Sequence, residues 1–134
     1  MLLGLALAGR SAHADPEWTD GYATYYGLTY NGQPLACGGV YASSDSRILA
    51  VGPALYGLPC GAEVEVCGPG GCAIVERRDS CPGCSANVLD LSEAANELVC
   101  GAPPHTCRVV FRLLAPVRIV APLTGDGGLL DAPQ

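Results

Sequence analysis

The sequence predicts a single, mainly β domain of the barrel type, braced by disulfides. Its 134 residues include 18 glycines and 11 prolines scattered between short apolar runs, which is typical of short strands joined by tight turns. Only the segment near residues 91–99 has the pattern of an α-helix, and the chain is long enough for one hydrophobic core but not two. Several short strands with a single short helix favour a compact barrel.

The N-terminal segment has the features of an export signal. An apolar stretch at residues 2–8 is followed by Ala12-His13-Ala14, the small-x-small pattern that signal peptidase accepts. We therefore interpret residues 1–14 as a signal peptide, the alternative being an apolar N-terminal strand, and expect a protein that is secreted or associated with the cell wall. No later run approaches the ~18 consecutive apolar residues of a membrane span, so no membrane partner is expected.

Eight cysteines in a small exported chain are better explained by disulfides than by free thiols. Zinc is an alternative, because a structural site takes four ligands from two close pairs, such as Cys67 with Cys72 and Cys81 with Cys84. A thioredoxin-type redox site needs its CxxC at the start of a helix, whereas the residues after Cys84 lead into a loop. We therefore expect no metal and no cofactor.

The acidic charge balance excludes one class of partner. A formal net charge of −6 and a pI near 4.6 argue against nucleic acid, which is bound through clustered Lys and Arg. A neutral polysaccharide is compatible with this balance, and so is a cationic or mixed-charge glycan such as peptidoglycan. The protein is expected to be a monomer.

The clearest local unit is a β-hairpin. Glutamate and valine alternate over residues 63–66, the turn GPGG occupies residues 68–71, and the apolar residues 73–75 follow. A hairpin brings Cys67 and Cys72 opposite each other, within reach of the ~5.5 Å Cα separation that a disulfide needs. The pattern therefore predicts this disulfide.

A strand and a helix complete the local pattern. In the strand at residues 107–114, apolar and basic side chains alternate, and the strand is expected to close the sheet. The residues on its two faces are Val109, Phe111 and Leu113 on one, and Arg108 and Arg112 on the other. In the helix, Ser92 is the expected N-cap, Leu91, Ala95 and Leu98 fall on one side, and Gly101 follows the end.

Three segments in fixed order resemble a known family. They are GYATYYG at residues 21–27, VCGPGGCAIVERRDSCPGC at residues 66–84, and VLDLSEAA at residues 88–95. Together they resemble the double-psi β-barrel of expansins, barwin-like proteins and the rare-lipoprotein-A group, and are most similar to the N-terminal expansin barrel. The resemblance implies six strands with one or two short helices, assigned to residues 15–114. Residues 115–134 then form a tail, with room for one edge strand at residues 117–120.

The resemblance also implies a shallow groove that holds a cell-wall polysaccharide. Asp90 matches the aspartate on the floor of that groove, Thr24 matches a groove threonine, and Asp79 matches the aspartate that precedes the loop after the hairpin. Asp90 and Asp79 are thus candidate catalytic residues. Tyr25 or Tyr26 would supply an aromatic face for a sugar ring, and the other would pack inward, because successive strand residues point to opposite faces.

Both aspartates also have a purely structural interpretation. Asp90 lies next to the expected helix start, where it would help to cap the helix, and Asp79 would pair with Arg77 or Arg78. In a dry cleft, by contrast, the pKa of a carboxyl group is raised and the group can donate a proton to a glycosidic oxygen.

The departures from the family pattern bear on catalysis. Hydrolysis needs two carboxyl groups that flank the scissile bond, but GYATYYG lacks the second aspartate that related endoglucanases carry in this strand. Residues 36–61 contain neither the glutamate nor the histidine of the lytic transglycosylases, and Cys81 stands where bacterial expansins have a groove tyrosine. Twenty residues follow Leu114, so the second, sugar-binding expansin domain is not expected.

The sequence therefore predicts a barrel that binds cellulose, chitin or peptidoglycan and loosens it without hydrolysis. The alternative is a weak lytic transglycosylase or glycoside hydrolase with Asp90 as its general acid. A competing class is a non-catalytic binding module or secreted effector. The expansin pattern also implies the disulfide Cys37–Cys60. With Cys67–Cys72 paired by the hairpin, the remaining four cysteines pair most simply as Cys81–Cys84 and Cys100–Cys107.

Overall fold

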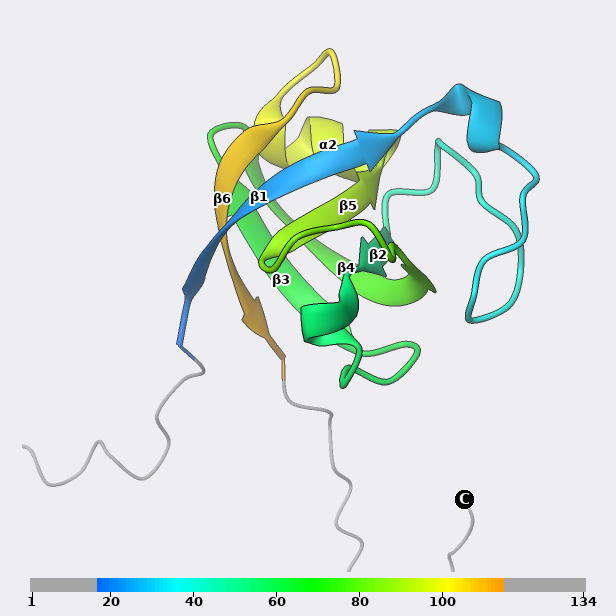
Figure 1. The fold of residues 1–134 in the computed structure, drawn as a ribbon. Helices are drawn as coiled ribbons and strands as arrows, with labels where there is room; N and C mark the ends of the chain where they lie inside the picture. The colour runs from blue at the N-terminus through cyan, green and yellow to red at the C-terminus, as the bar shows by residue number, and fades with distance from the viewer. Residues whose placement is uncertain (1–16, 115–134) are drawn as a thin grey trace, which may run out of the picture.

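The computed structural model describes residues 17–114, which form a closed six-stranded barrel (Figure 1). The strands are β1 (Thr19–Tyr26), β2 (Ile48–Val51), β3 (Glu63–Gly68), β4 (Gly71–Ser80), β5 (Val88–Ser92) and β6 (Cys107–Leu113). Around the barrel they follow the order β1-β5-β2-β4-β3-β6, with β1/β5 and β2/β4 parallel and the other pairs antiparallel. The predicted mainly β, six-stranded barrel is confirmed. The expected signal peptide and the tail with its edge strand lie outside the described residues.

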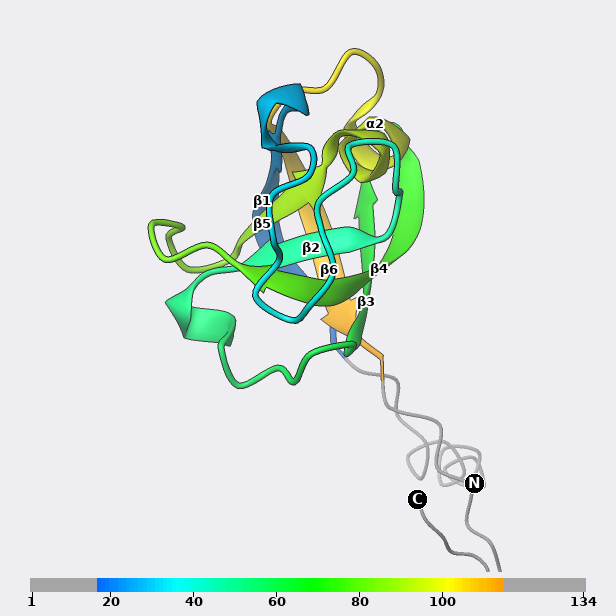
Figure 2. The same cartoon turned by 90° about the vertical axis from the view of Figure 1, so that its right-hand side faces the viewer.

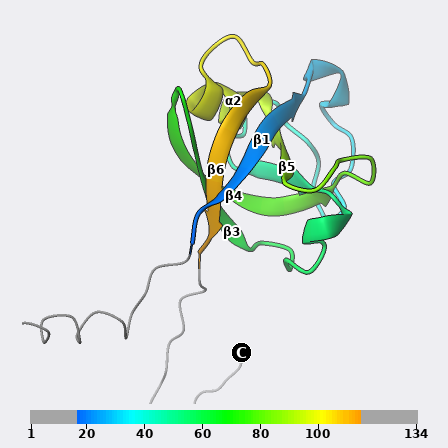
Figure 3. The same cartoon turned by 60° about the vertical axis from the view of Figure 1, so that its left-hand side comes forward.

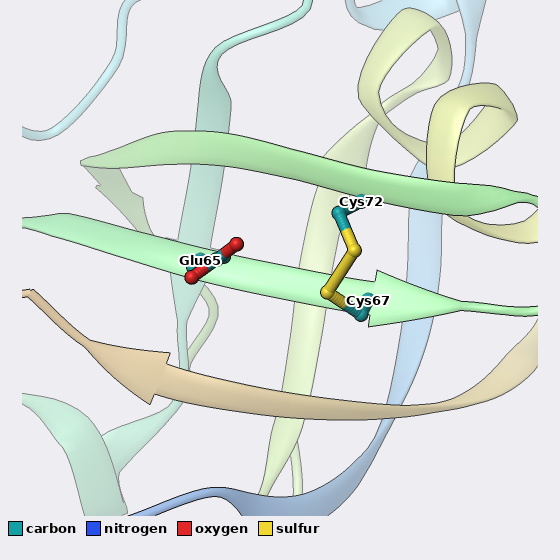
Figure 4. Close-up of side chains that lie close together, drawn as sticks. All are labelled: Glu65, Cys67 and Cys72. Atoms are coloured by element: carbon teal, nitrogen blue, oxygen red, sulfur yellow. A yellow bond between two sulfur atoms is a disulfide. The ribbon is translucent and has the colours of Figure 1, made fainter. Parts of the chain in front are cut away.

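The predicted hairpin is formed by β3 and β4. Cys67 lies opposite Cys72, their Cα atoms are 4.0 Å apart, and a disulfide joins them (Figure 4). Val64 and Val66 are fully buried, as the alternation requires. The turn lies against the end of the helix, where the Gly70 N–H donates to the Val99 carbonyl at 2.8 Å. The disulfide thus fixes the hairpin end that packs against the helix.

Strand β6 closes the barrel by pairing with both β1 and β3. Residues 107–111 of β6 run antiparallel to residues 19–23 of β1, so the two ends of the described chain lie side by side (Figures 1 and 3). Val109 and Phe111 are buried as predicted. Leu113, expected on the same face, is 41% exposed because it lies at the last residue of the strand, beyond the core.

The helix α2 (Glu93–Cys100) lies across the barrel end opposite the chain ends (Figure 1). Ser92 is its N-cap and accepts a hydrogen bond from the Ala95 N–H at 3.3 Å, as predicted. The expected apolar face is wrong by one position, because Leu91 belongs to β5 and Leu98 is 48% exposed. Val99 is buried in place of Leu98.

All eight cysteines lie within the described residues and form the four expected disulfides. They pair as Cys37–Cys60, Cys67–Cys72, Cys81–Cys84 and Cys100–Cys107. No cysteine therefore offers the thiolate that the zinc alternative requires. Among residues 17–114, no helix is long and apolar enough to cross a membrane.

The connection from β1 to β2 lies over the side of the barrel that carries β2 (Figure 2). It contains the 3₁₀ turn Leu28–Tyr30, and a second 3₁₀ turn, Pro53–Leu55, follows β2. Leu35 and Tyr41 from this connection are buried against Ile48 at the start of β2, with Tyr26 packed on them. The connection thus forms one wall over the outer surface of β2 and β4.

Candidate functional site

Three of the predicted site residues lie in one row across four neighbouring strands. Thr24 on β1 is opposite Asp90 on β5, Asp90 is opposite Ala50 on β2, and Ala50 is opposite Asp79 on β4. Side chains of directly opposed residues point to the same face of a sheet. The topology therefore brings both aspartates and the threonine to one strip of the outer barrel surface.

A groove of about 430 Å³ lies over this strip. Its wall includes residues of the β1–β2 connection and of the loop after β4. It is lined by Tyr26, Thr29, Tyr30, Gln33, Pro34, Leu35, Tyr41, Ala50, Asp79, Ser80, Cys81, Pro82 and Asp90. The groove is thus lined by aromatic side chains and by residues of the CPGC turn.

Asp90 is a partly buried carboxylate with one polar side-chain contact. Thr24 Oγ1 donates to Asp90 Oδ1 at 2.8 Å. Burial raises the pKa of Asp90, the hydrogen bond from Thr24 opposes that rise, and the charge of Asp79 adds to it. Asp90 lies in β5, and the helix is capped by Ser92 instead. The geometry therefore favours the groove interpretation of Asp90 over the capping one.

Asp79 is held by contacts from β1 and from the β1–β2 connection. Its Oδ1 accepts a hydrogen bond from the Ala36 N–H at 2.8 Å, and its Oδ2 lies 3.5 Å from the Tyr26 hydroxyl, which donates to it. The neighbouring Arg78 lies 3.8 Å from Asp45 and 3.7 Å from Glu76. Asp79 therefore ties the β1–β2 connection to β4.

Of the two adjacent tyrosines, Tyr26 lines the groove. Thr24 and Tyr26 share one face of β1, and Tyr25 points to the other, where it is 40% exposed rather than packed inward as expected. Tyr25 is therefore not part of the groove.

The β1–β2 connection adds two groove tyrosines that the sequence patterns did not single out. Tyr41 stacks on Tyr26 with ring centroids 4.1 Å apart, and Tyr30 meets Tyr26 edge to face at 5.9 Å. The Tyr41 hydroxyl donates to the Tyr26 carbonyl and accepts from the Glu93 N–H at 3.3 Å. Burial raises the pKa of Tyr41 to about 12, and burial with the charges of Asp79 and Asp90 raises that of Tyr26. Both phenols are therefore neutral donors at neutral pH.

The site combines an acid, a hydroxyl and an aromatic wall. A carboxyl group with a raised pKa can hold or donate a proton, and a neutral tyrosine ring offers a face for the apolar side of a sugar. The two aspartates are separated by one intervening strand, so their backbones lie roughly 10 Å apart.

The fold is similar to three solved structures. An expansin from Clavibacter michiganensis gives a TM-score of 0.63 and 28% identity, over 76% of this chain and 52% of that chain. A mutant expansin from the same organism, in complex with cellohexaose, gives a TM-score of 0.62 and 25% identity, over 76% of this chain and 53% of that chain. The Streptomyces papain inhibitor gives a TM-score of 0.62 and 26% identity, over 74% of this chain and 96% of that chain.

The similarity is structural. No protein-family model and no curated protein matches the sequence. The chain spans about half the length of the two expansin chains. The closed barrel, its two parallel strand pairs and its similarity to the expansin structures confirm the predicted resemblance, and the described domain is an expansin-like double-psi β-barrel.

Proposed function

We propose that the groove binds a cell-wall polysaccharide and loosens its packing without hydrolysing it. The observation that carries this proposal is the row formed by Thr24, Asp90 and Asp79 beneath a wall of tyrosines. One similar barrel belongs to an expansin in complex with cellohexaose. The groove offers what a sugar chain needs, because ring faces stack on tyrosine and hydroxyl groups bond to carboxylates.

The exposed aromatic contact for a sugar ring is Tyr30. Its side chain is 51% exposed and lines the groove, whereas Tyr41 is 1% exposed and supports Tyr26 from behind. Tyr26 lies between them and donates to Asp79. A sugar chain along the strip would therefore stack on Tyr30 and place its hydroxyl groups over the two carboxylates.

The proposed absence of hydrolysis rests on the contacts that each carboxylate makes within the fold. Both hydrolytic mechanisms need one carboxyl group as acid and a second as nucleophile or base. Asp90 suits the role of acid, but both oxygens of Asp79 accept hydrogen bonds from Ala36 and Tyr26. Asp79 therefore serves as a structural tie, which suits it less to act as a nucleophile or base, although its oxygens can still accept hydrogen bonds from sugar hydroxyl groups.

The alternative proposal is a weak lytic transglycosylase or glycosidase in which Asp90 protonates the leaving oxygen. The raised pKa of Asp90 is the observation that favours it. A transglycosylase needs no activated water, so one acid would suffice for leaving-group protonation. Release of soluble products separates this alternative from loosening.

The experiment is a pull-down against cellulose, chitin and peptidoglycan, followed by a reducing-sugar assay and mass spectrometry of released fragments. Binding to at least one glycan with no released product supports loosening. Release of sugar ends or anhydro-sugar products that Asp90→Asn abolishes supports the enzyme alternative. Binding to none of the three glycans contradicts the proposal.

Matched variants locate the binding surface. Tyr30→Ala removes the exposed groove ring and is expected to weaken binding at least about fivefold, since stacking on an aromatic ring contributes about 1–3 kcal/mol in comparable ring–ring contacts. Tyr22→Ala removes an equally exposed tyrosine from β1 outside the groove, where it lies near Arg108 instead. Equal loss of binding in both variants would show that the glycan does not occupy the groove.

A second candidate function is binding to a papain-like protease. The observation that favours it is coverage, because the alignment includes 96% of the Streptomyces papain inhibitor but about half of each expansin chain. Inhibition of papain at micromolar protein concentration would support this function. Full protease activity at saturating protein would exclude papain as the target.

We also propose that the protein acts outside the cytoplasm. Four disulfides in a barrel of this size are characteristic of oxidising compartments. The proposal rests as well on the export signal expected at residues 1–14. Detection of the processed chain in culture medium or a cell-wall fraction tests it.

A further inference from the structure

The CPGC turn forms one wall of the groove. It connects β4 to β5, Cys81 and Pro82 line the groove, and the disulfide Cys81–Cys84 spans a sequence separation of 3. Pro82 and Gly83 are exposed, and both cysteines are partly exposed, so a small thiol can reach the disulfide. The turn thus presents a disulfide to whatever enters the groove.

Asp90 lies directly beside this disulfide. A carboxylate oxygen of Asp90 and both sulfur atoms lie within 4.8 Å of one another. Asp90 is partly buried, and burial raises its pKa, so that it holds a proton at a higher pH than an exposed carboxyl group does. Tyr26, Tyr41 and Asp79 are the other titratable groups near Asp90. The disulfide therefore has a partly buried carboxyl group beside its sulfur atoms.

A second disulfide in the same barrel provides a contrast. The carboxylate of Glu65 lies within 4.8 Å of the sulfur atoms of Cys67 and Cys72 (Figure 4). Arg112 binds that carboxylate through Nε and through its terminal nitrogen, both at 2.9 Å. The carboxylate beside Cys67–Cys72 is therefore engaged in an ion pair with an arginine. A carboxylate lies near both disulfides, but Asp90, beside Cys81–Cys84, is bonded to the hydroxyl of Thr24 instead.

We propose that Cys81–Cys84 is a thiol–disulfide exchange site, opened by a dithiol reductant, with Asp90 as the proton donor to the leaving sulfur. The thiolate of the reductant attacks one sulfur, the Cys81–Cys84 bond breaks, and a mixed disulfide forms. The other cysteine leaves as a thiolate and takes the proton of Asp90. The second thiol of the reductant loses its proton to the Asp90 carboxylate and attacks the mixed disulfide. The second cysteine leaves as a thiolate and takes this proton from Asp90, which regains one from solvent, so the dithiol is oxidised and both cysteines are reduced.

The fold around the turn is expected to persist when the disulfide opens. The Cys81 N–H donates to the Val51 carbonyl at 2.8 Å, and the Cys84 N–H donates to the Cys81 carbonyl at 3.0 Å. Both hydrogen bonds are made by the backbone, so they do not depend on the sulfur–sulfur bond. Reduction therefore frees two side chains in the groove wall while the turn and the strands remain paired.

The site differs from a thioredoxin-type centre. Residues 85–87 follow Cys84 as a turn and lead into β5, as the sequence predicted, so no helix start stabilises a thiolate there. This chemistry makes the disulfide an acceptor of electrons from a dithiol, and its product has two cysteine thiols in the groove wall.

The test follows the four disulfides in one sample. The oxidised full chain is incubated with dithiothreitol at a series of pH values from 7.5 down to 6 without denaturant, quenched with iodoacetamide at intervals, and mapped by mass spectrometry. Cys81 and Cys84 are expected to be alkylated before the other six cysteines. Asp90→Asn is expected to slow their alkylation about tenfold or more at the acidic end of the series and to leave Cys67–Cys72 unchanged. The slowing should grow as the pH falls, because a larger fraction of Asp90 then holds a proton; a fully protonated, positioned acid contributes roughly 100-fold or more.

The controls separate acid catalysis from charge and from unfolding. Asp20→Asn removes the same charge from an exposed position on β1 and is expected to leave the rate unchanged. Loss of negative charge alone would speed attack by an anionic thiol, so slowing in Asp90→Asn reports the lost proton. Opening of all four disulfides at one rate, or an unchanged rate in Asp90→Asn, would overturn the proposal. No glycan is present, so the result is independent of the proposed function.

Discussion

The hydrogen bond between Thr24 and Asp90 makes a testable contribution to stability that depends on pH. Thr24→Val keeps the shape of the side chain and removes the donor that lies 2.8 Å from the carboxylate. A hydrogen bond to a charged group contributes about 1.5–3 kcal/mol, and the partly buried carboxylate is left without this partner. We therefore expect the free energy of unfolding to fall by about 1.5–3 kcal/mol at pH 7.

The sign of the pH dependence follows from the pKa of Asp90. Burial raises this pKa in the folded protein above the usual 3.8, so ionisation of Asp90 destabilises the fold. That cost is fully present above the folded pKa and disappears as the pH falls to 3.8 and below. Asp90→Asn is therefore expected to increase the free energy of unfolding at pH 7, and this gain should shrink with acid.

Thr24→Val raises the pKa of Asp90 further, because the hydrogen bond from Thr24 is what opposes the effect of burial. Its destabilisation is thus also expected to be largest at neutral pH and to shrink in acid. Urea unfolding of both variants at a series of pH values from 7 to about 3.5 measures these differences directly. Asp20→Asn is the control for net charge. A pH-independent gap for Thr24→Val, or equal behaviour of the two aspartate variants, would refute this account of Asp90.

Three further changes have defined outcomes. Gly52→Ala places a Cβ atom 2.7 Å from the Cys84 carbonyl oxygen, so it should cost about 1–3 kcal/mol of stability and weaken glycan binding. Gly83→Ala, in the CPGC turn that contains Cys84, meets nothing within 4 Å and should have neither effect. Melting and pull-down measurements test both variants. Ser92→Ala removes the helix cap and should cost about 1–2 kcal/mol while binding is retained, and loss of binding would implicate the helix in the groove. Full reduction should lower the melting temperature strongly, since each disulfide contributes on the order of 2–4 kcal/mol, and an unchanged melt would show that the core suffices alone.

Local sequence signals predicted the parts of the fold that are made by neighbours in the chain. The hairpin disulfide Cys67–Cys72 needs only alternation and a tight turn, and both are visible within a dozen residues. Strand β2 gave no such signal, because Ile48–Val51 is buried at every position and alternation is absent. A short, uniformly apolar run is equally compatible with a buried strand and with part of a buried helix.

The local pattern predicted the helix but not which of its side chains are buried. Leu91, Ala95 and Leu98 have helical spacing, but Leu91 is used by β5 to pair with β1 and β2. The helix then begins at Glu93, and its buried side is set by contact with the barrel end, which selects Val99 instead of Leu98. Tertiary packing, rather than helical spacing, determines which face is covered.

The sequence patterns singled out Thr24, Tyr26, Asp79 and Asp90 among the groove residues, but not Tyr30 and Tyr41. Thr24, Asp79 and Asp90 lie in segments with a recognisable family pattern, so their roles could be carried over residue by residue. Tyr30 and Tyr41 come from the β1–β2 connection, whose path is fixed by the contact between Ala36 and Asp79. No periodicity marks such residues, because their positions depend on a hydrogen bond between parts of the chain that are 43 residues apart.

Barrel topology explains why these residues form one site. Antiparallel β2 and β5 lie in the middle, and each pairs in parallel with an outer neighbour, so four chain segments run through one strip of surface. Ala50 lies between the two aspartates in that strip, and its small side chain, which is 1% exposed, lines the groove between them. If the groove binds a sugar chain as proposed, that chain would meet a carboxylate on each side of Ala50, which suits extended contact with several sugar units better than attack on a single bond.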